Sequence, residues 1–462
     1  MIPAPLIFLV LPWLAAPLIY LLRLRGWFRA EVALAVTVAI VGALLAGALP
    51  LAAPPWVRDS FGVLGRTFVM EPVDRGALVQ IFALAALIFL GAGLHPAGPY
   101  FLPAGTGILS LLAAALFVRP FLFAAIFLEV AAALAVFMLA DEAHPLTRGA
   151  LRFFTYTTLG MPFILFAAWL IESSAANPGN AQLLVQATYA LAAGFALLLA
   201  VVPFHSWLPL AADHAPPLAT AFLTSVMRLP VVFLLLKLLD GYPWLSQNPL
   251  VYGALLLAGT GMVILGALFV FGQQNLGRSM GYALVIEYGA ILMALGLGTR
   301  AGVEAALAAL TVRGLGLWLW ALGLSELRRE ASDNAFATLH GLGWRRPFAV
   351  TAVAVGMLSL IGLPLMAGFP PRWALLRLLA EQTPVLAAVL LAAMTSVGVV
   401  VMRGLAALTT PRRPDEVIEP QESRLAQVTY TVAVAAVLVL GAFPQWLLPS
   451  LTLAAAFPRL GP

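Results

Sequence analysis

Long apolar stretches separated by short polar segments run along the whole chain. About fourteen of them have the length of an α-helix that crosses the hydrocarbon core of a bilayer, which is about 20 residues. Their approximate ranges are 4–22, 30–53, 77–94, 100–118, 120–140, 148–172, 181–203, 214–240, 250–272, 279–298, 302–323, 347–369, 383–403 and 426–449. This pattern predicts an all-α, polytopic bundle of transmembrane helices. The polar segments are too short for an inserted soluble domain.

The composition supports lipid as the main solvent of this chain. Of its 462 residues, 62% are hydrophobic and 10% are charged, whereas soluble domains carry about 25% charged residues. The chain has no cysteine, which excludes disulfides and Cys-ligated clusters. Five scattered histidines have no metal-ligand spacing: His95, His144, His205, His214 and His340. We therefore expect no metal or cofactor in this chain, and no nucleic-acid partner despite the net charge of +5.

Arginines are concentrated in alternate loops, while the opposite loops at 173–180 and 241–249 have none. The positive-inside rule places the arginine-rich loops in the cytoplasm. The chain is then a multi-pass protein of the inner (cytoplasmic) membrane with both termini on the outer side. The loop arginines are Arg23, Arg25, Arg29, Arg148, Arg152, Arg278, Arg328, Arg329, Arg345, Arg346, Arg412, Arg413 and Arg424.

Proline and glycine cluster at 203–217 and 362–371, next to predicted helices. Broken helices are tolerated in membranes where the freed backbone groups face protein or a watery cavity. We predict non-helical backbone near 368–372, at Pro370 and Pro371, and a distortion near 226–230, at Pro230. A neighbouring arginine could donate to the carbonyls that such breaks leave free.

Four charged residues, Glu129, Arg228, Glu287 and Arg313, lie well inside predicted spans, where each charge costs at least about 2.5 kcal/mol. A fifth, Arg372, follows Pro370 and Pro371, where the twelfth predicted helix breaks. They form either a proton or cation path, or buried ion pairs that hold helices together. His205 either transfers protons or hydrogen-bonds a carbonyl freed by Pro209. Lys237, the only lysine, lies near a helix end with Asp240, where its ammonium could extend to the membrane surface.

Four segments together resemble one family. They are FLEV around Glu129, PFHSWLPLAADHAPPLATAFLTSVMR at 203–228, GQQNLGRSMGYALVIEYG at 272–289 and MLSLIGLPLMAGFPPRW at 357–373. They are similar to signature segments of the antiporter-like membrane subunits of respiratory complex I, Mrp-type cation/proton antiporters and energy-converting hydrogenases. Within that family the length suits the M-, N- or D-type subunits, and FLTSVMR is closest to the N-type.

The resemblance implies broken helices and an internal inverted repeat. It divides the chain into N-terminal peripheral helices (1–118), two antiporter-like bundles (119–272 and 273–403) and a C-terminal loop with the last helix (404–462). It also implies a proton-translocating, or formerly translocating, membrane subunit of a complex I-like NADH-quinone oxidoreductase. The redox cofactors would lie in other subunits. The expected partners are H⁺ or Na⁺, lipid and other membrane subunits, including further antiporter-like ones.

Family roles carry over only to matching positions. Glu129 matches the gating glutamate, Arg228 and Arg372 replace titratable residues of the central axis, and Glu287 stands where many members have histidine. Leu198 replaces the lysine that normally partners the glutamate, and arginine is a poor proton relay because the pKa of its guanidinium lies far above physiological pH. We therefore expect Arg228 to take over as the partner of Glu129.

Two functional hypotheses stay open. In the first, Glu129, Glu287 and His205 titrate beside Arg228, Arg313, Arg372 and Lys237, and the subunit conducts ions. In the second, the subunit is a non-conducting scaffold. Mrp antiporters, hydrogenase-linked complexes and inorganic-carbon uptake complexes share these segments, so the electron donor, if any, is not determined by them.

Overall fold

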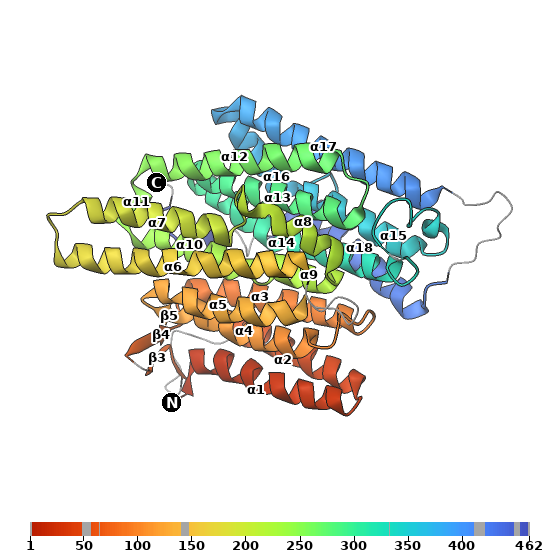
Figure 1. The fold of residues 1–462 in the computed structure, drawn as a ribbon, viewed down its shortest axis with the longest axis horizontal. Helices are drawn as coiled ribbons and strands as arrows, with labels where there is room; N and C mark the ends of the chain where they lie inside the picture. The colour runs from red at the N-terminus through yellow and green to blue at the C-terminus, as the bar shows by residue number, and fades with distance from the viewer. Residues whose placement is uncertain are drawn as a thin grey trace. The chain divides into compact units, whose positions relative to one another are not determined.

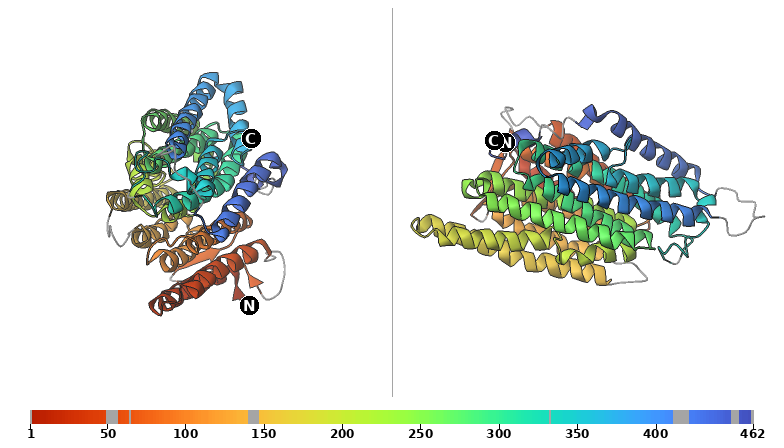
Figure 2. Two further views of the ribbon diagram at one scale, coloured as in Figure 1. Left: turned by 90° about the vertical axis from the view of Figure 1, so that its right-hand side faces the viewer. Right: turned by 90° about the horizontal axis from the view of Figure 1, so that it is seen from above.

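The computed structural model describes residues 2–48, 57–63, 65–139, 147–331, 333–410, 421–447 and 453–460. His144, Arg412 and Arg413 lie outside the described residues. The described part of the chain divides into two compact units (Figure 1, Figure 2). Unit 1 comprises Met1–Gly93, Gly98–His205 and Val226–Gln247, and unit 2 comprises Leu94–Ala97, Ser206–Ser225 and Asn248–Pro462.

Unit 1 is a helical bundle with short strands at one end. Helices α6 and α7, α2 and α3, and α1 and α4 pack side by side. Its helices are α1 (Ala4–Leu24), α2 (Phe28–Ala48), α3 (Pro72–Ala92), α4 (Phe101–Phe117), α5 (Ala124–Met138), α6 (Arg148–Ala176), α7 (Gln182–Leu198), α10 (Arg228–Gly241) and α11 (Pro243–Ser246).

The strands of unit 1 are each two to four residues long. One pair is parallel and the other three form an antiparallel sheet, in which Phe61 lies opposite Phe68. They are β1 (Ile2–Pro3), β2 (Val57–Arg58), β3 (Ser60–Val63), β4 (Arg66–Val69) and β5 (Val118–Arg119).

Unit 2 is a second helical bundle, in which α13 packs between α12 and the short α8. Helix α14 contacts α9, α15 and α16. The helices are α8 (Trp207–His214), α9 (Pro217–Ser225), α12 (Pro249–Phe271), α13 (Leu276–Gly296), α14 (Arg300–Leu327), α15 (Pro347–Ile361), α16 (Phe369–Gln382), α17 (Pro384–Thr409) and α18 (Arg424–Ala442).

The predicted all-α transmembrane bundle is confirmed. Ten helical segments of the described chain are long and apolar enough to span a membrane, with the stretch from α9 to α10 counted as one. Four shorter apolar helices, α4, α5, α7 and α15, complete the set of fourteen. The internal inverted repeat and the four-part division of the chain stay predictions.

Both predicted helix breaks occur, one of them earlier than expected. Helix α15 ends at Ile361, and Gly362 adopts φ +76° there, a conformation that favours glycine. The non-helical backbone spans 362–368, so Pro370 and Pro371 begin α16 instead of interrupting it. This placement follows from proline's tolerance in the first helical turn. The second break falls at Val226 and Met227, before α10 begins at Arg228.

Glycines allow α13 to approach the backbone of α8 closely. A Cβ atom on Gly281 would lie 2.3 Å from the Cα of Pro209, and one on Gly277 would lie 2.5 Å from the carbonyl oxygen of Ala212. Small residues at such contacts let transmembrane helices pack backbone to backbone. The short α8 therefore depends on these two glycines for its position against α13.

We expect Gly281→Ala to destabilise the protein by about 1–3 kcal/mol, because the added methyl group overlaps rigid backbone atoms. Thermal unfolding followed by tryptophan fluorescence measures the effect. Gly261→Ala in α12 is the matched control, since its Cβ would meet no heavy atom within 4 Å. Equal melting temperatures for the two variants would show that the α8–α13 approach does not limit stability.

Candidate functional site

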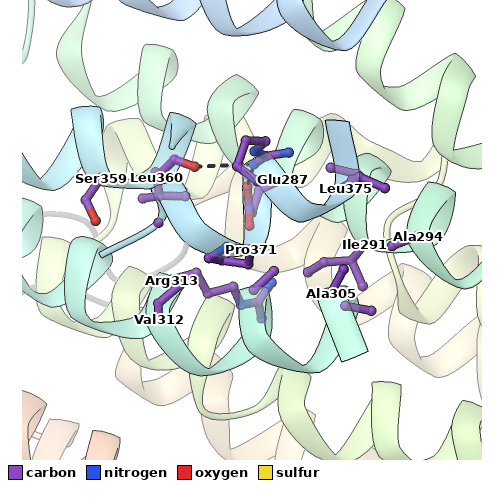
Figure 3. A pocket seen from close by; sticks show the side chains of 15 residues that line it. Glu287, Ile291, Ala294, Ala305, Val312, Arg313, Ser359, Leu360, Pro371 and Leu375 are labelled. Atoms are coloured by element: carbon purple, nitrogen blue, oxygen red, sulfur yellow. Dashed lines mark hydrogen bonds and ion pairs between the residues drawn. The ribbon is translucent and has the colours of Figure 1, made fainter. Parts of the chain in front are cut away.

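Three of the predicted charges line one small cavity in unit 2 (Figure 3). Glu287 comes from the middle of α13, Arg313 from α14 and Arg372 from the first turn of α16. Their exposed fractions are 4%, 2% and 6%. The cavity offers about 20 Å³ to the centre of a water molecule, which is room for about one water.

Arg372 connects Glu287 to the break between α15 and α16. Its Nη2 forms an ion pair with Oε2 of Glu287 and donates to the carbonyl oxygen of Leu360, 3.3 Å away. In a continuous helix the N–H of residue 364 would donate to that carbonyl, but residue 364 is Pro364. The expectation that an arginine would serve a carbonyl freed at this break is therefore confirmed.

Arg313 serves the end of α9 in the same way. Its Nη2 donates to the carbonyl oxygen of Thr224 at 2.8 Å, and the hydroxyl of Tyr288 donates to the same oxygen at 2.7 Å. The guanidinium also lies 4.7 Å from the centroid of the Tyr288 ring. Thr224 is in the last turn of α9, whose carbonyls have no partner within that helix.

Glu129 and Arg228 of unit 1 have different hydrogen-bond partners. Oε1 of the half-buried Glu129 accepts from the hydroxyl of Thr158 in α6 at 2.7 Å. Nη1 of Arg228 donates to the carbonyl oxygen of Leu198, the last residue of α7, and the guanidinium faces the ring of Phe153. The expected link between Glu129 and Arg228 stays a prediction.

The two histidines between α7 and α9 bind nearby backbone. His205 lies half-buried in a 3-10 turn, Phe204–Ser206, and hydrogen-bonds the backbone of Pro203. His214 ends α8, and its Nδ1 lies 3.0 Å from the carbonyl oxygen of Leu210. His205 thus hydrogen-bonds the backbone, as its structural role requires, but the partner is Pro203 and not a carbonyl freed by Pro209. A role for His205 in proton transfer stays a prediction.

Lys237 does not extend to the membrane surface, so that expectation is wrong. Its Nζ forms an ion pair with the fully buried Asp74 and donates to the carbonyl oxygen of Leu116 at 3.0 Å. The predicted apolar stretch 77–94 leaves Asp74 outside the helix. The helix α3 begins at Pro72, where Glu71 and Asp74 form a capping box.

A second buried cluster surrounds His95 in unit 2, and the sequence did not reveal it. Nε2 of His95 lies 2.7 Å from the hydroxyl of Tyr430 in α18, and Nδ1 lies 3.4 Å from Oε2 of Glu326 in α14. Arg346 also binds Glu326, at 2.5 Å, and Glu330. Burial lowers the pKa of His95 to about 4, against the opposing charge of Glu326. His95 is therefore a neutral hydrogen-bonding group near pH 7.

We expect Arg372→Leu to destabilise the protein by about 3–5 kcal/mol, because it leaves Glu287 buried without its cation. The double variant Arg372→Leu/Glu287→Leu removes both charges and should recover a large part of the loss. Denaturant titration of the four proteins in a double-mutant cycle measures this coupling. Strictly additive effects would mean that the Glu287–Arg372 pair contributes no coupling energy.

We expect stability to fall by about 2 kcal/mol between pH 8 and pH 5 through His95 alone. The pKa of His95 is about 4 in the folded protein and 6.5 in an unperturbed histidine. Between these two pH values the unfolded chain therefore binds a proton that the folded protein does not. The loss begins below about pH 6.5 and levels off below about pH 4. The thermal midpoint of His95→Gln should vary less with pH, whereas the exposed control His214→Gln should follow the wild type. A wild-type pH profile in His95→Gln would rule this account out.

Comparisons with known proteins agree with this architecture. The family model described as NADH:quinone oxidoreductase/Mrp antiporter, transmembrane, matches residues 121–398. A curated relative, NADH-quinone oxidoreductase subunit N of Cereibacter sphaeroides, is 33% identical over 58% of this chain and 59% of its own length. The chain spans about half the length of the curated relatives it matches.

Solved structures share the fold over nearly the whole chain. A chain of the Mrp complex from Dietzia sp. DQ12-45-1b has a TM-score of 0.83 at 17% identity, with 98% of this chain and 97% of that chain covered. A chain of respiratory complex I from Thermus thermophilus with bound NADH has a TM-score of 0.79 at 22% identity, with 99% and 100% covered. Both neighbours come from multisubunit membrane complexes. The family model covers more than half of the residues, so this multi-pass membrane protein belongs to the NADH:quinone oxidoreductase/Mrp antiporter transmembrane family.

Proposed function

We propose that this protein is the antiporter-like, proton-translocating membrane subunit of a complex I-like NADH-quinone oxidoreductase. The relatives named NADH-quinone oxidoreductase subunit N support this assignment. Its partners would be other membrane subunits, including further antiporter-like ones, and H⁺ or Na⁺. The arginine-rich alternate loops favour an inner membrane location with both termini on the outer side.

The observation that carries the proposal is the Glu287–Arg372 ion pair at a helix break inside the membrane. A carboxylate and two guanidinium groups around a cavity are costly in a bilayer and mark ion pathways by default. Glu287 is the one carboxyl group among the charged residues that line this cavity, so a proton that passes through it would bind there. Arginine keeps its proton, so Arg313 and Arg372 act as fixed positive charges. Moving Arg372 away from Glu287 lets the carboxylate bind a proton, and its return expels that proton.

Unit 1 would contribute Glu129 as a second titrating carboxylate. Its hydroxyl partner, Thr158, can donate to the ionised form or accept from the protonated form. Arg228 is held on the Leu198 carbonyl and would supply a fixed charge.

A non-conducting scaffold is the second candidate, and one observation favours it. Leu198 stands at the position where a titratable partner of Glu129 is expected, and Arg228 is fixed to its carbonyl oxygen. Conduction through unit 1 then lacks its usual lysine. The scaffold would keep the buried ion pairs only for helix packing.

Proton flux in proteoliposomes that contain the assembled complex separates the two functions. We expect Glu287→Gln to lower the number of protons moved per NADH oxidised, because glutamine has the same shape but cannot titrate. Glu381→Gln, an exposed change on α16, is the matched control and should keep the wild-type ratio.

Native gels and the NADH oxidation rate show whether each variant complex has assembled. An assembled Glu287→Gln complex with an unchanged proton ratio would refute conduction through this cavity and leave the scaffold function.

A further inference from the structure

The guanidinium of Arg313 has two N–H donor groups that no described residue accepts. One nitrogen, Nη2, donates to the Thr224 carbonyl, but Nε and Nη1 are buried and have no hydrogen-bond partner in the described residues. No carboxylate of the described residues lies within 4.0 Å of this guanidinium. Buried charged donors without partners are strongly unfavourable, so such groups point to a bound water or ion.

The cavity that Arg313 lines has an unbalanced charge. Its charged lining residues are Arg313, Arg372 and Glu287, and the ion pair between Glu287 and Arg372 leaves one positive charge uncompensated. The remaining walls are Ser359, Leu360, Pro371 and small or apolar residues. In Figure 3, the Arg313 side chain extends from α14 beneath Pro371 toward Ala305. An uncompensated charge among apolar walls is destabilising because the surroundings polarise little.

We propose that this cavity binds one small monovalent anion, such as chloride, on the guanidinium of Arg313. A cation is disfavoured by the net positive charge. A water molecule would satisfy the free donors but would leave that charge unbalanced. The space is sized for about one water molecule, which suits a monatomic halide better than a larger polyatomic anion. Charge-assisted hydrogen bonds from Nε and Nη1 would hold the ion.

The anion would complete a neutral site of four charges, with two positive and two negative. Arg313 would then have a negative partner that does not depend on the protonation of Glu287. The proposal concerns binding and is independent of whether the subunit conducts protons.

Thermal unfolding of the assembled complex in chloride and in gluconate, at one ionic strength and pH, tests the site. Binding to the folded state raises the melting temperature with the logarithm of the halide concentration once the site begins to fill. We expect this rise in the wild type. In Arg313→Gln the apparent chloride affinity should fall by at least about tenfold, because a charge-assisted bond is worth about 1.5–3 kcal/mol.

Arg377→Gln removes an exposed arginine of α16 and is the matched control, with the wild-type chloride response expected. An equal chloride response in Arg313→Gln, or none in the wild type, overturns the proposal.

Anomalous diffraction from wild-type crystals grown in bromide gives a second readout that needs no variant, in case Arg313→Gln fails to assemble. A bromide peak within hydrogen-bond distance of Nε or Nη1 of Arg313 supports the site. A map with ordered water there and no bromide peak shows that water alone fills the cavity and refutes it.

Discussion

Carbonyl oxygens at the ends of interrupted helices need hydrogen-bond donors, and a bilayer interior supplies none. Among the described residues, three arginines are buried, and each meets this need inside its own unit. Arg228 donates to the last residue of α7, Arg313 to the last turn of α9 and Arg372 to the last turn of α15. The broken helices and the buried charges are therefore mutually dependent. Without the arginines, the carbonyls of Leu198 and Leu360 would lose these donors, whereas the Thr224 carbonyl would keep the Tyr288 hydroxyl.

Arginine meets this requirement and keeps a fixed positive charge. A guanidinium presents several donors in one plane, so it can bind a carbonyl and still face a carboxylate. Arg372 does both through Nη2, which contacts the Leu360 carbonyl and the Glu287 carboxylate. The guanidinium keeps its charge at any physiological pH. Any change of protonation at the Glu287–Arg372 pair therefore occurs on the carboxylate.

Local signals along the chain predicted the parts of the fold that depend on local chemistry. The helices follow from apolar length, the breaks follow from Pro230 and from the proline and glycine cluster at 362–371, and the buried charges stand out against their apolar neighbours. The predicted break before α16 lies a few residues too late, because prolines that a first helical turn tolerates have the same local signal as prolines that interrupt a helix.

Pairing between distant residues could not be read from the same signals. Asp74 and Lys237 are 163 residues apart, and His95 and Tyr430 are 335 apart. The predicted start of α3 lies too late in the chain, because the charge of Asp74 lowers the local hydrophobicity where the helix begins. Glu129 was expected to need a cation, yet a threonine hydroxyl on α6 meets it. Which side chain reaches such a group depends on helix rotation and packing.

The Asp74–Lys237 pair has a practical consequence for chemical labelling. Lys237 carries the only side-chain amine in the chain, and its nitrogen is enclosed by Asp74 and the Leu116 carbonyl. Nucleophilic attack on an acylating reagent requires access to the amine nitrogen, which this enclosure prevents. Amine-reactive reagents would therefore modify a side chain only when the contact between α10 and the start of α3 opens. The rate of acylation at this one residue would report how often that happens.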